Sequence, residues 1–181
     1  MGKWGVFYSS VTGNTKMVAE RIAEAAGEAD LLPVEEMPED LTGYEVVALG
    51  YWLRRGGADP KMTKYLPHVK NAKVILFETH GTDPGSEHAV TAYARAAYLL
   101  GDGCEILGTF GCQGKINPAL IEKRKNSAPD DPHGGTAAMK RWKRAASHPD
   151  EEDLQAAADF VAQMKRKLII MQKYREQKSI G

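Results

Sequence analysis

A hydroxyl-rich turn near the N-terminus carries the residues of this sequence that are best suited to chemistry. It lies between the apolar run 4–8 and a helical pattern over 16–26, and it consists of Ser9, Ser10, Val11, Thr12, Gly13, Asn14 and Thr15. A helix N-terminus offers unpaired backbone N–H groups and a partial positive charge, and both attract an anion. Ser10, Thr12 and Thr15 add hydroxyl donors, and Gly13 allows the backbone to approach closely. The turn therefore predicts a phosphate-binding loop, with a plain helix cap as the alternative.

The turn lacks what two other phosphate loops require. An ATP-binding P-loop needs Gly-Lys-Ser/Thr, and a dinucleotide-binding turn needs G-x-G-x-x-G, and neither occurs here. This pattern favours a phosphate monoester over ATP or NAD.

The order Ser-x-Thr-Gly-Asn-Thr after a first strand resembles the FMN-phosphate loop of the flavodoxins. The resemblance implies FMN as the cofactor, and it places the flavin ring between the loops after the third and fourth strands. The cofactor-binding residues implied there are Tyr51, Trp52, Leu53, Thr79, His80, Gly81 and Thr82. Tyr51 or Trp52 is expected to stack on the ring, although either could be a simple rim aromatic. No catalytic side chain and no metal are expected, because the flavin itself performs the redox chemistry.

Five apolar, β-branched runs and four helical patterns must position these loops. The runs cover 4–8, 31–34, 46–50, 74–79 and 106–112, and the helical patterns cover 16–26, 60–70, 87–100 and 151–176. Alternating strands and helices predict an α/β, doubly wound parallel sheet with helices on both faces. The flavodoxin resemblance implies the strand order 2-1-3-4-5 in a single domain, 1–181, whose ligand lies beyond the carboxyl ends of the strands.

A helical, basic insertion at about 115–148 interrupts the alternation after the fifth strand. Its basic residues outnumber Glu122, Asp130 and Asp131, and they are Lys115, Lys123, Arg124, Lys125, Lys140, Arg141, Lys143 and Arg144. We interpret the insertion as a docking surface for a redox partner protein, with a solvated surface hairpin as the alternative. This arrangement departs from both common flavodoxin types and resembles a branch found in anaerobes. Some members of that branch resemble the flavodoxin-like partner of bilirubin reductase.

The composition excludes several classes of protein. The 181 residues are 43% hydrophobic and 27% charged with a net charge of zero, which is typical of a globular protein. No apolar run approaches the roughly 20 residues that cross a bilayer, and the N-terminus lacks a signal-peptide layout, so we expect a cytoplasmic protein without a membrane partner. Nucleic acid is not an expected partner, because no reading motif occurs. Cys104 and Cys112 are expected to be reduced thiols, and the oligomeric state stays open.

The sequence favours an FMN-dependent electron carrier that serves a partner reductase. The alternative is an FMN-dependent oxidoreductase that reduces a small anionic substrate, such as a quinone-like or tetrapyrrole acid, with His133 as proton donor. A third class is a binding module that has lost its cofactor. Arg54 and Arg55 after the third strand predict a less negative potential for the second electron than in acidic flavodoxins. Residues 110–113 are expected to help close the pocket.

Overall fold

The computed structural model describes residues 2–83, 85–124 and 135–179. Its main sheet has five parallel strands in the order β2-β1-β3-β5-β6, which confirms the predicted order. The strands are β1 (Trp4–Tyr8), β2 (Ala29–Pro33), β3 (Val46–Arg54), β5 (Lys73–His80) and β6 (Glu105–Gln113). The order reverses between β1 and β3, so the edge beyond the carboxyl ends of these strands is where a ligand is expected.

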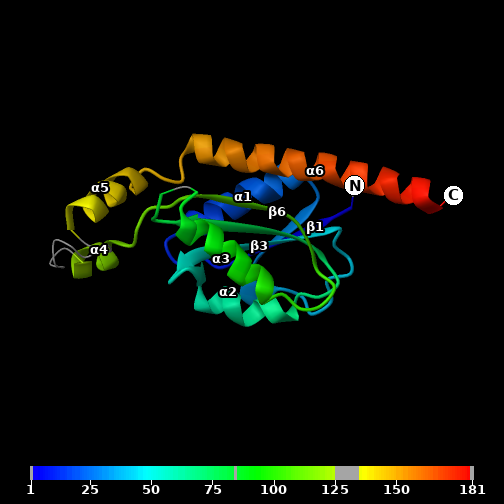
Figure 1. Ribbon diagram of the computed structural model, residues 1–181, viewed down its shortest axis with the longest axis horizontal. Helices are drawn as coiled ribbons and strands as arrows, with labels where there is room; N and C mark the ends of the chain where they lie inside the picture. Colours follow the sequence, from blue (N-terminus) through cyan, green and yellow to red (C-terminus); the bar gives the residue numbers. More distant parts are fainter. Residues whose placement is uncertain (1, 84, 125–134, 180–181) are drawn as a thin grey trace.

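Helices cover both faces of the sheet (Figure 1). The side chains of Val6, Ala48 and Phe77 pack in the core beneath α1 (Asn14–Ala26) and α6 (Glu151–Ser179). The residues one position away along each strand point to the opposite face, where α2 (Pro60–Tyr65) and α3 (Glu87–Tyr98) lie. Two short 3₁₀ helices, η1 (Val34–Glu36) and η2 (Leu66–His68), complete this second layer.

Strand β3 is four residues longer than predicted. It pairs antiparallel with β4 (Gly57–Ala58) through a two-residue turn in which Arg55 and Gly56 have φ angles of 53° and 74°. Two positive φ angles are typical of the type I′ turn, whose twist matches that of the flanking strands. Arg95 of α3 fastens the turn by donating to the carbonyl oxygens of Arg55 and Gly56 at 3.2 and 3.0 Å. The expected loop after the third strand is therefore a hairpin.

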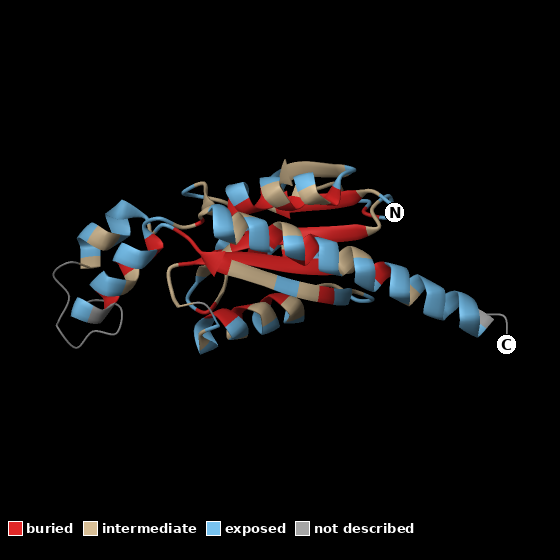
Figure 2. Cartoon of the chain, turned by 90° about the horizontal axis from the view of Figure 1, so that it is seen from above, coloured by how far each residue is buried: buried red, intermediate tan, exposed pale blue. Residues whose placement is uncertain are grey.

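Two short helices form the described part of the insertion, α4 (Pro118–Arg124) and α5 (Gly135–Ala145). They project from the body at the end of the sheet where the strands terminate (Figures 1 and 2). At the opposite end, α6 has 29 residues and a length of about 43 Å, and its last turns run past the sheet. Within the described ranges, no helix is both long enough and apolar enough to span a bilayer.

Candidate functional site

The N-terminus of α1 has the features of an anion site. Its cap is Gly13, with φ 90° and ψ −16°, and no side chain accepts a hydrogen bond from the first turn. The first turn also contains no acidic residue. The backbone N–H groups of this turn are therefore available to an anion.

Three of the predicted loop side chains already have partners. Ser9 Oγ donates to Asp59 Oδ1 at 2.9 Å, and Asn14 Nδ2 donates to the carbonyl oxygen of Lys115 at 2.8 Å. The hydroxyls of Thr15 and Thr79 are hydrogen-bonded to each other at 2.9 Å in a buried position. These side chains fasten the loop to α2, to β5 and to the segment after β6.

Asp59 is a site residue that sequence reasoning missed. It is 1% exposed, caps α2, and its Oδ1 atom accepts from the backbone N–H groups of Lys61 and Met62 as well as from Ser9. The Asp-Pro pair at 59–60 signals a helix start, but only the fold brings it against a residue 50 positions earlier.

Two buried donors beside the loop have no hydrogen-bond partner, namely Ser10 Oγ and Trp52 Nε1. The parallel register pairs Tyr8 with Gly50, and Ser9 N donates to Gly50 O, so Ser10 follows the end of β1 beside the strand that contains Trp52. Trp52 is in register with Thr79, whose hydroxyl contacts Thr15 in the first turn of α1. Buried donors are normally satisfied, so an anion bound here would complete the hydrogen bonding of this region. The residues present therefore fit a phosphate group.

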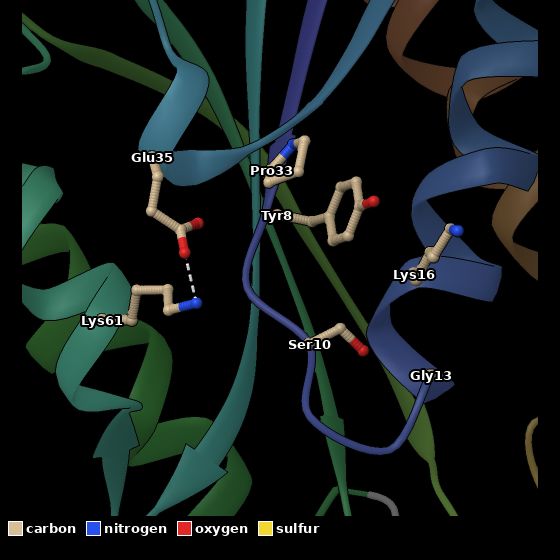
Figure 3. Close-up of a pocket in the computed structure, with 7 residues that line it drawn as sticks. All are labelled: Tyr8, Ser10, Gly13, Lys16, Pro33, Glu35 and Lys61. Atoms are coloured by element: carbon tan, nitrogen blue, oxygen red, sulfur yellow. Dashed lines mark ion pairs between the residues drawn. The ribbon is translucent and has the colours of Figure 1, made fainter.

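A cavity of about 430 Å³ lies beside the loop (Figure 3). It is lined by Tyr8, Ser10, Gly13, Lys16, Pro33, Glu35 and Lys61. The ring of Tyr8 lies between Pro33 and Lys16, and the Ser10 hydroxyl is directed toward the start of α1. Lys61 forms an ion pair with Glu35, which lowers the pKa of the Glu35 carboxyl and raises the pKa of the Lys61 ammonium. Lys16 is paired with Glu20 on the exposed side of α1, so both ammonium groups at this cavity have a carboxylate partner.

The two aromatic residues of β3 lie on opposite faces of the sheet. Tyr51 is 0% exposed and packs in the core beneath α2 and α3, with Leu53 half-buried on the same face. The expectation that Tyr51 presents a ring plane at the rim is therefore corrected, because strand β3 continues through this residue and turns its side chain inward. Trp52 points to the α1 face and stays the candidate for contact with the flavin.

The loop after β5 is held by the end of β6. His80 is 5% exposed, and its Nδ1–H donates to the Thr82 carbonyl oxygen at 3.2 Å. Gln113 Nε2 donates to the same oxygen at 2.8 Å. A side chain at Gly81 would meet Ile116, whose Cδ1 atom lies 2.6 Å from the Cβ position. Burial lowers the pKa of His80, so the imidazole is neutral at neutral pH and its Nδ1–H group is the donor in the bond to Thr82.

Glu78 is a second residue that sequence reasoning missed. Its side chain is 0% exposed, and neither carboxyl oxygen has a partner at hydrogen-bond distance among the described residues, although the Tyr51 hydroxyl is near enough to interact with it. It is in register with Tyr51 on β3 and Gly111 on β6, and the Tyr93 hydroxyl fills the space where Gly111 has no Cβ. Burial raises the pKa of Glu78 to about 8, so the carboxyl is mostly protonated at neutral pH. A single acidic residue within the apolar run 74–79 was the available signal.

The remaining predicted contacts lie at the rim or outside the described chain. Val11 is 68% exposed and Thr12 is exposed at the tip of the loop. Cys112 is buried, which raises the pKa of its thiol, and both cysteines are free thiols as expected. His133 lies outside the described residues.

A cluster of His148, Asp150 and Asp153 has metal-ligating side chains within 4.8 Å of one another. Asp150 Oδ1 accepts from the backbone N–H groups of Glu152 and Asp153, and Asp153 Oδ2 accepts from Asp150 N. This reciprocal pattern is a capping box, and His148 Nδ1 bonds to Asp153 Oδ2 at 2.5 Å. Capping of the N-terminus of α6 therefore explains why these three side chains lie close together, without a metal ion.

A doubly wound parallel sheet in the order β2-β1-β3-β5-β6, with a candidate anion site at its first strand-to-helix turn, is typical of flavodoxin-like, FMN-binding proteins. A family model described as "Flavodoxin domain" matches residues 5–162, and the chain belongs to this family. The family membership confirms FMN as the cofactor. FMN supplies reversible electron uptake when bound, and the residues above are those that would hold it.

Two curated relatives are similar along nearly their whole length. The flavodoxin-like domain-containing protein BilS of Clostridioides difficile (strain CD3) is 34% identical over 173 residues, covering 92% of this chain and 98% of the relative. BilS of Clostridium symbiosum (strain WAL-14163) is 28% identical, covering 88% and 94%. Among solved structures, a Streptococcus pneumoniae TIGR4 flavodoxin has a TM-score of 0.57 at 13% identity, covering 92% of this chain and 99% of its own. Oxidised flavodoxin 2 from Bacillus cereus has a TM-score of 0.54 at 20% identity with the same coverage. These structures support the fold.

Proposed function

We propose that this protein is a cytoplasmic FMN electron carrier that delivers electrons to a partner reductase. The observation that carries the proposal is a pair of buried donors without a partner among the described residues, Ser10 Oγ and Trp52 Nε1, in the segments that follow β1 and end β3 near the uncapped N-terminus of α1. A phosphate monoester at this position would accept from both donors and from the backbone N–H groups that follow Gly13.

In the proposed binding mode, one group of residues contacts the phosphate and a second group stabilises the conformation of the loop. Ser10, Thr12, Gly13 and Trp52 face the phosphate, whereas Ser9, Asn14 and Thr15 keep the loop in shape through the hydrogen bonds described above. The flavin ring lies between the β3–β4 hairpin and residues 79–82, beyond the carboxyl ends of β3 and β5.

The surroundings of the proposed ring position favour a carrier over an enzyme. His80 is neutral, and its Nδ1–H is engaged by Thr82, so it is poorly placed to deliver a proton to a substrate through that atom. A carrier needs no such group, because the cofactor supplies the redox chemistry. The sequence resembles the flavodoxin-like partner of bilirubin reductase, so a tetrapyrrole reductase is the candidate electron acceptor.

A second candidate is an FMN-dependent oxidoreductase that reduces a small anionic substrate at its own flavin. It is favoured by a hollow lined by Lys140, Lys143 and Arg144 on α5, near the loop after β5. Cationic side chains at that place would attract a quinone-like or tetrapyrrole acid.

An anaerobic visible spectrum of the purified protein, supplemented with FMN and followed through stepwise reduction, tests the proposal. A carrier is expected to bind FMN, to pass through a one-electron intermediate, and to oxidise NADPH slowly in stopped-flow mixing. Direct two-electron reduction with rapid NADPH turnover would support the oxidoreductase. Failure to bind FMN would refute both candidates.

A further inference from the structure

The insertion forms a positively charged arm, which we define as residues 115–124 and 135–148. Its described residues include seven Lys or Arg side chains and one acidic side chain, Glu122. The seven are Lys115, Lys123, Arg124, Lys140, Arg141, Lys143 and Arg144. The arm projects into solvent from the end of the sheet (Figure 2), so its charge is presented to other molecules.

The helix α5 has one buried face and one basic face. Ala138, Trp142 and Ala145 are 0%, 9% and 0% exposed, and they recur at helical spacing. On the other face, residues 140, 143 and 144 have i, i+3, i+4 spacing and together line a hollow of about 640 Å³. Within the described chain, the lining comes from these three side chains of a single helix. Because the described lining comes from one helix and is entirely cationic, the hollow presents a broad basic surface that suits an acidic face of a protein.

The root of the arm contacts both loops of the proposed flavin site. The backbone of Lys115 accepts from Asn14 Nδ2 at 2.8 Å and donates to the His148 carbonyl oxygen at 2.8 Å, so the arm starts and ends beside the phosphate loop. Arg144 donates to Asp83 Oδ1 at 2.5 Å, and Asp83 directly follows Thr82. A protein bound to the basic face of α5 would therefore lie next to the cofactor, where electron transfer needs it.

The charge of the rest of the chain has the opposite sign. Residues 1–50 contain three basic and nine acidic side chains, although the whole chain is neutral. A basic arm on a chain whose remaining residues are acidic overall attracts an acidic partner, which raises the association rate and makes it depend on salt.

We propose that the arm is a docking surface for the acidic face of a redox partner protein, whose carboxylates bind Lys140 and Lys143. This inference rests on the proposed carrier function. In the complex, one electron leaves the reduced flavin and enters the oxidised acceptor of the partner, and no covalent bond forms or breaks.

Stopped-flow oxidation of the reduced holoprotein by two probe proteins of opposite charge tests the proposal. The probes are an acidic plastocyanin and a basic cytochrome c, each at 20 mM and 300 mM NaCl. The test variant is Lys140→Glu with Lys143→Glu, and the matched control is Lys173→Glu with Lys178→Glu on the exposed distal part of α6.

The wild-type rate constant with plastocyanin is expected to fall at least tenfold between the two salt concentrations. At 20 mM NaCl the test variant is expected to react at least tenfold more slowly with plastocyanin and faster with cytochrome c, whereas the control stays within about twofold of the wild type. Equal effects of the two variants, or no effect of the test variant, would overturn the docking surface.

Oxidation by ferricyanide separates this failure from a failure of the proposed function. Wild-type protein that binds FMN and gives single electrons to ferricyanide, but shows no arm-dependent rate with plastocyanin, would leave the carrier function standing and refute the docking surface. Protein that binds no FMN would refute the carrier function and with it the inference that rests on it.

Discussion

Replacing Glu78 by glutamine should make the protein more stable, and increasingly so as the pH rises. The Glu78 carboxyl is 0% exposed and has no partner at hydrogen-bond distance within the described chain, so its ionised form is strongly disfavoured in the folded protein. Glutamine has nearly the same shape and cannot ionise. The variant therefore removes the ionisation while keeping the packing against Tyr51 and Tyr93.

The magnitude follows from the pKa of Glu78, which burial raises from 4.5 to about 8. Between these values the unfolded chain has lost the proton and the folded protein keeps it, so the wild-type stability falls as the pH rises through this window. One pKa unit corresponds to about 1.4 kcal/mol, so the loss approaches about 4 to 5 kcal/mol above pH 8. The difference in unfolding free energy between variant and wild type should therefore grow by about 4 kcal/mol from pH 5 to pH 9.

Urea unfolding of the FMN-free proteins, followed by circular dichroism at pH 5, 7 and 9, measures this difference. Glu28→Gln serves as the control, because Glu28 is exposed and its substitution should add little pH dependence. A difference between Glu78→Gln and the wild type that is the same at pH 5 and pH 9 would refute the reasoning. It would mean that Glu78 ionises in the folded protein as readily as in the unfolded chain.

Three further predictions concern the phosphate loop and the hairpin. Ser10→Ala should weaken FMN binding by about 5- to 30-fold, equivalent to about 1 to 2 kcal/mol, while riboflavin binding measured by fluorescence stays unchanged. Trp52→Phe should weaken FMN binding by a similar factor, because the indole N–H is lost. Equal losses of FMN and riboflavin binding in the Ser10 variant would show that its hydroxyl does not hold the phosphate. Asp59→Ala should lower the unfolding free energy by about 2 kcal/mol in urea titration, because the cap of α2 and the hydrogen bond from Ser9 are lost together. Asp59→Asn should keep most of the wild-type stability, and an alanine variant as stable as the wild type would contradict this role. Arg54→Glu with Arg55→Glu should lower the potential for the second electron by about 20 to 60 mV in potentiometric titration. The effect is modest because both side chains are exposed on the hairpin. An unchanged potential would show that the two arginines lie too far from the flavin to affect it.

The strands and the turn between β1 and α1 could be predicted because their signals are local. Apolar runs of strand length alternate with helical spacing along the chain, and the turn 9–15 stands between the first run and the first helix. The strand ends were less accurate. Residues 51–54 continue β3, because the turn at Arg55 and Gly56 gives them a partner strand, and an Arg-Gly pair is a weak sequence signal for such a turn.

The sequence by itself determined the fold, the family and the identity of the cofactor, since these depend on the order of residues within short segments. Only the tertiary structure decided what each side chain does there. It bonds Ser9 to Asp59 and Thr15 to Thr79, and it leaves Ser10 and Trp52 with unpaired buried donors. It also turns Tyr51 toward Glu78 on the inner face and joins the arm to the site through Arg144 and Asp83. The physical reason is that burial and hydrogen bonding depend on contacts between segments 50 to 100 residues apart, and these exist only after the sheet has formed.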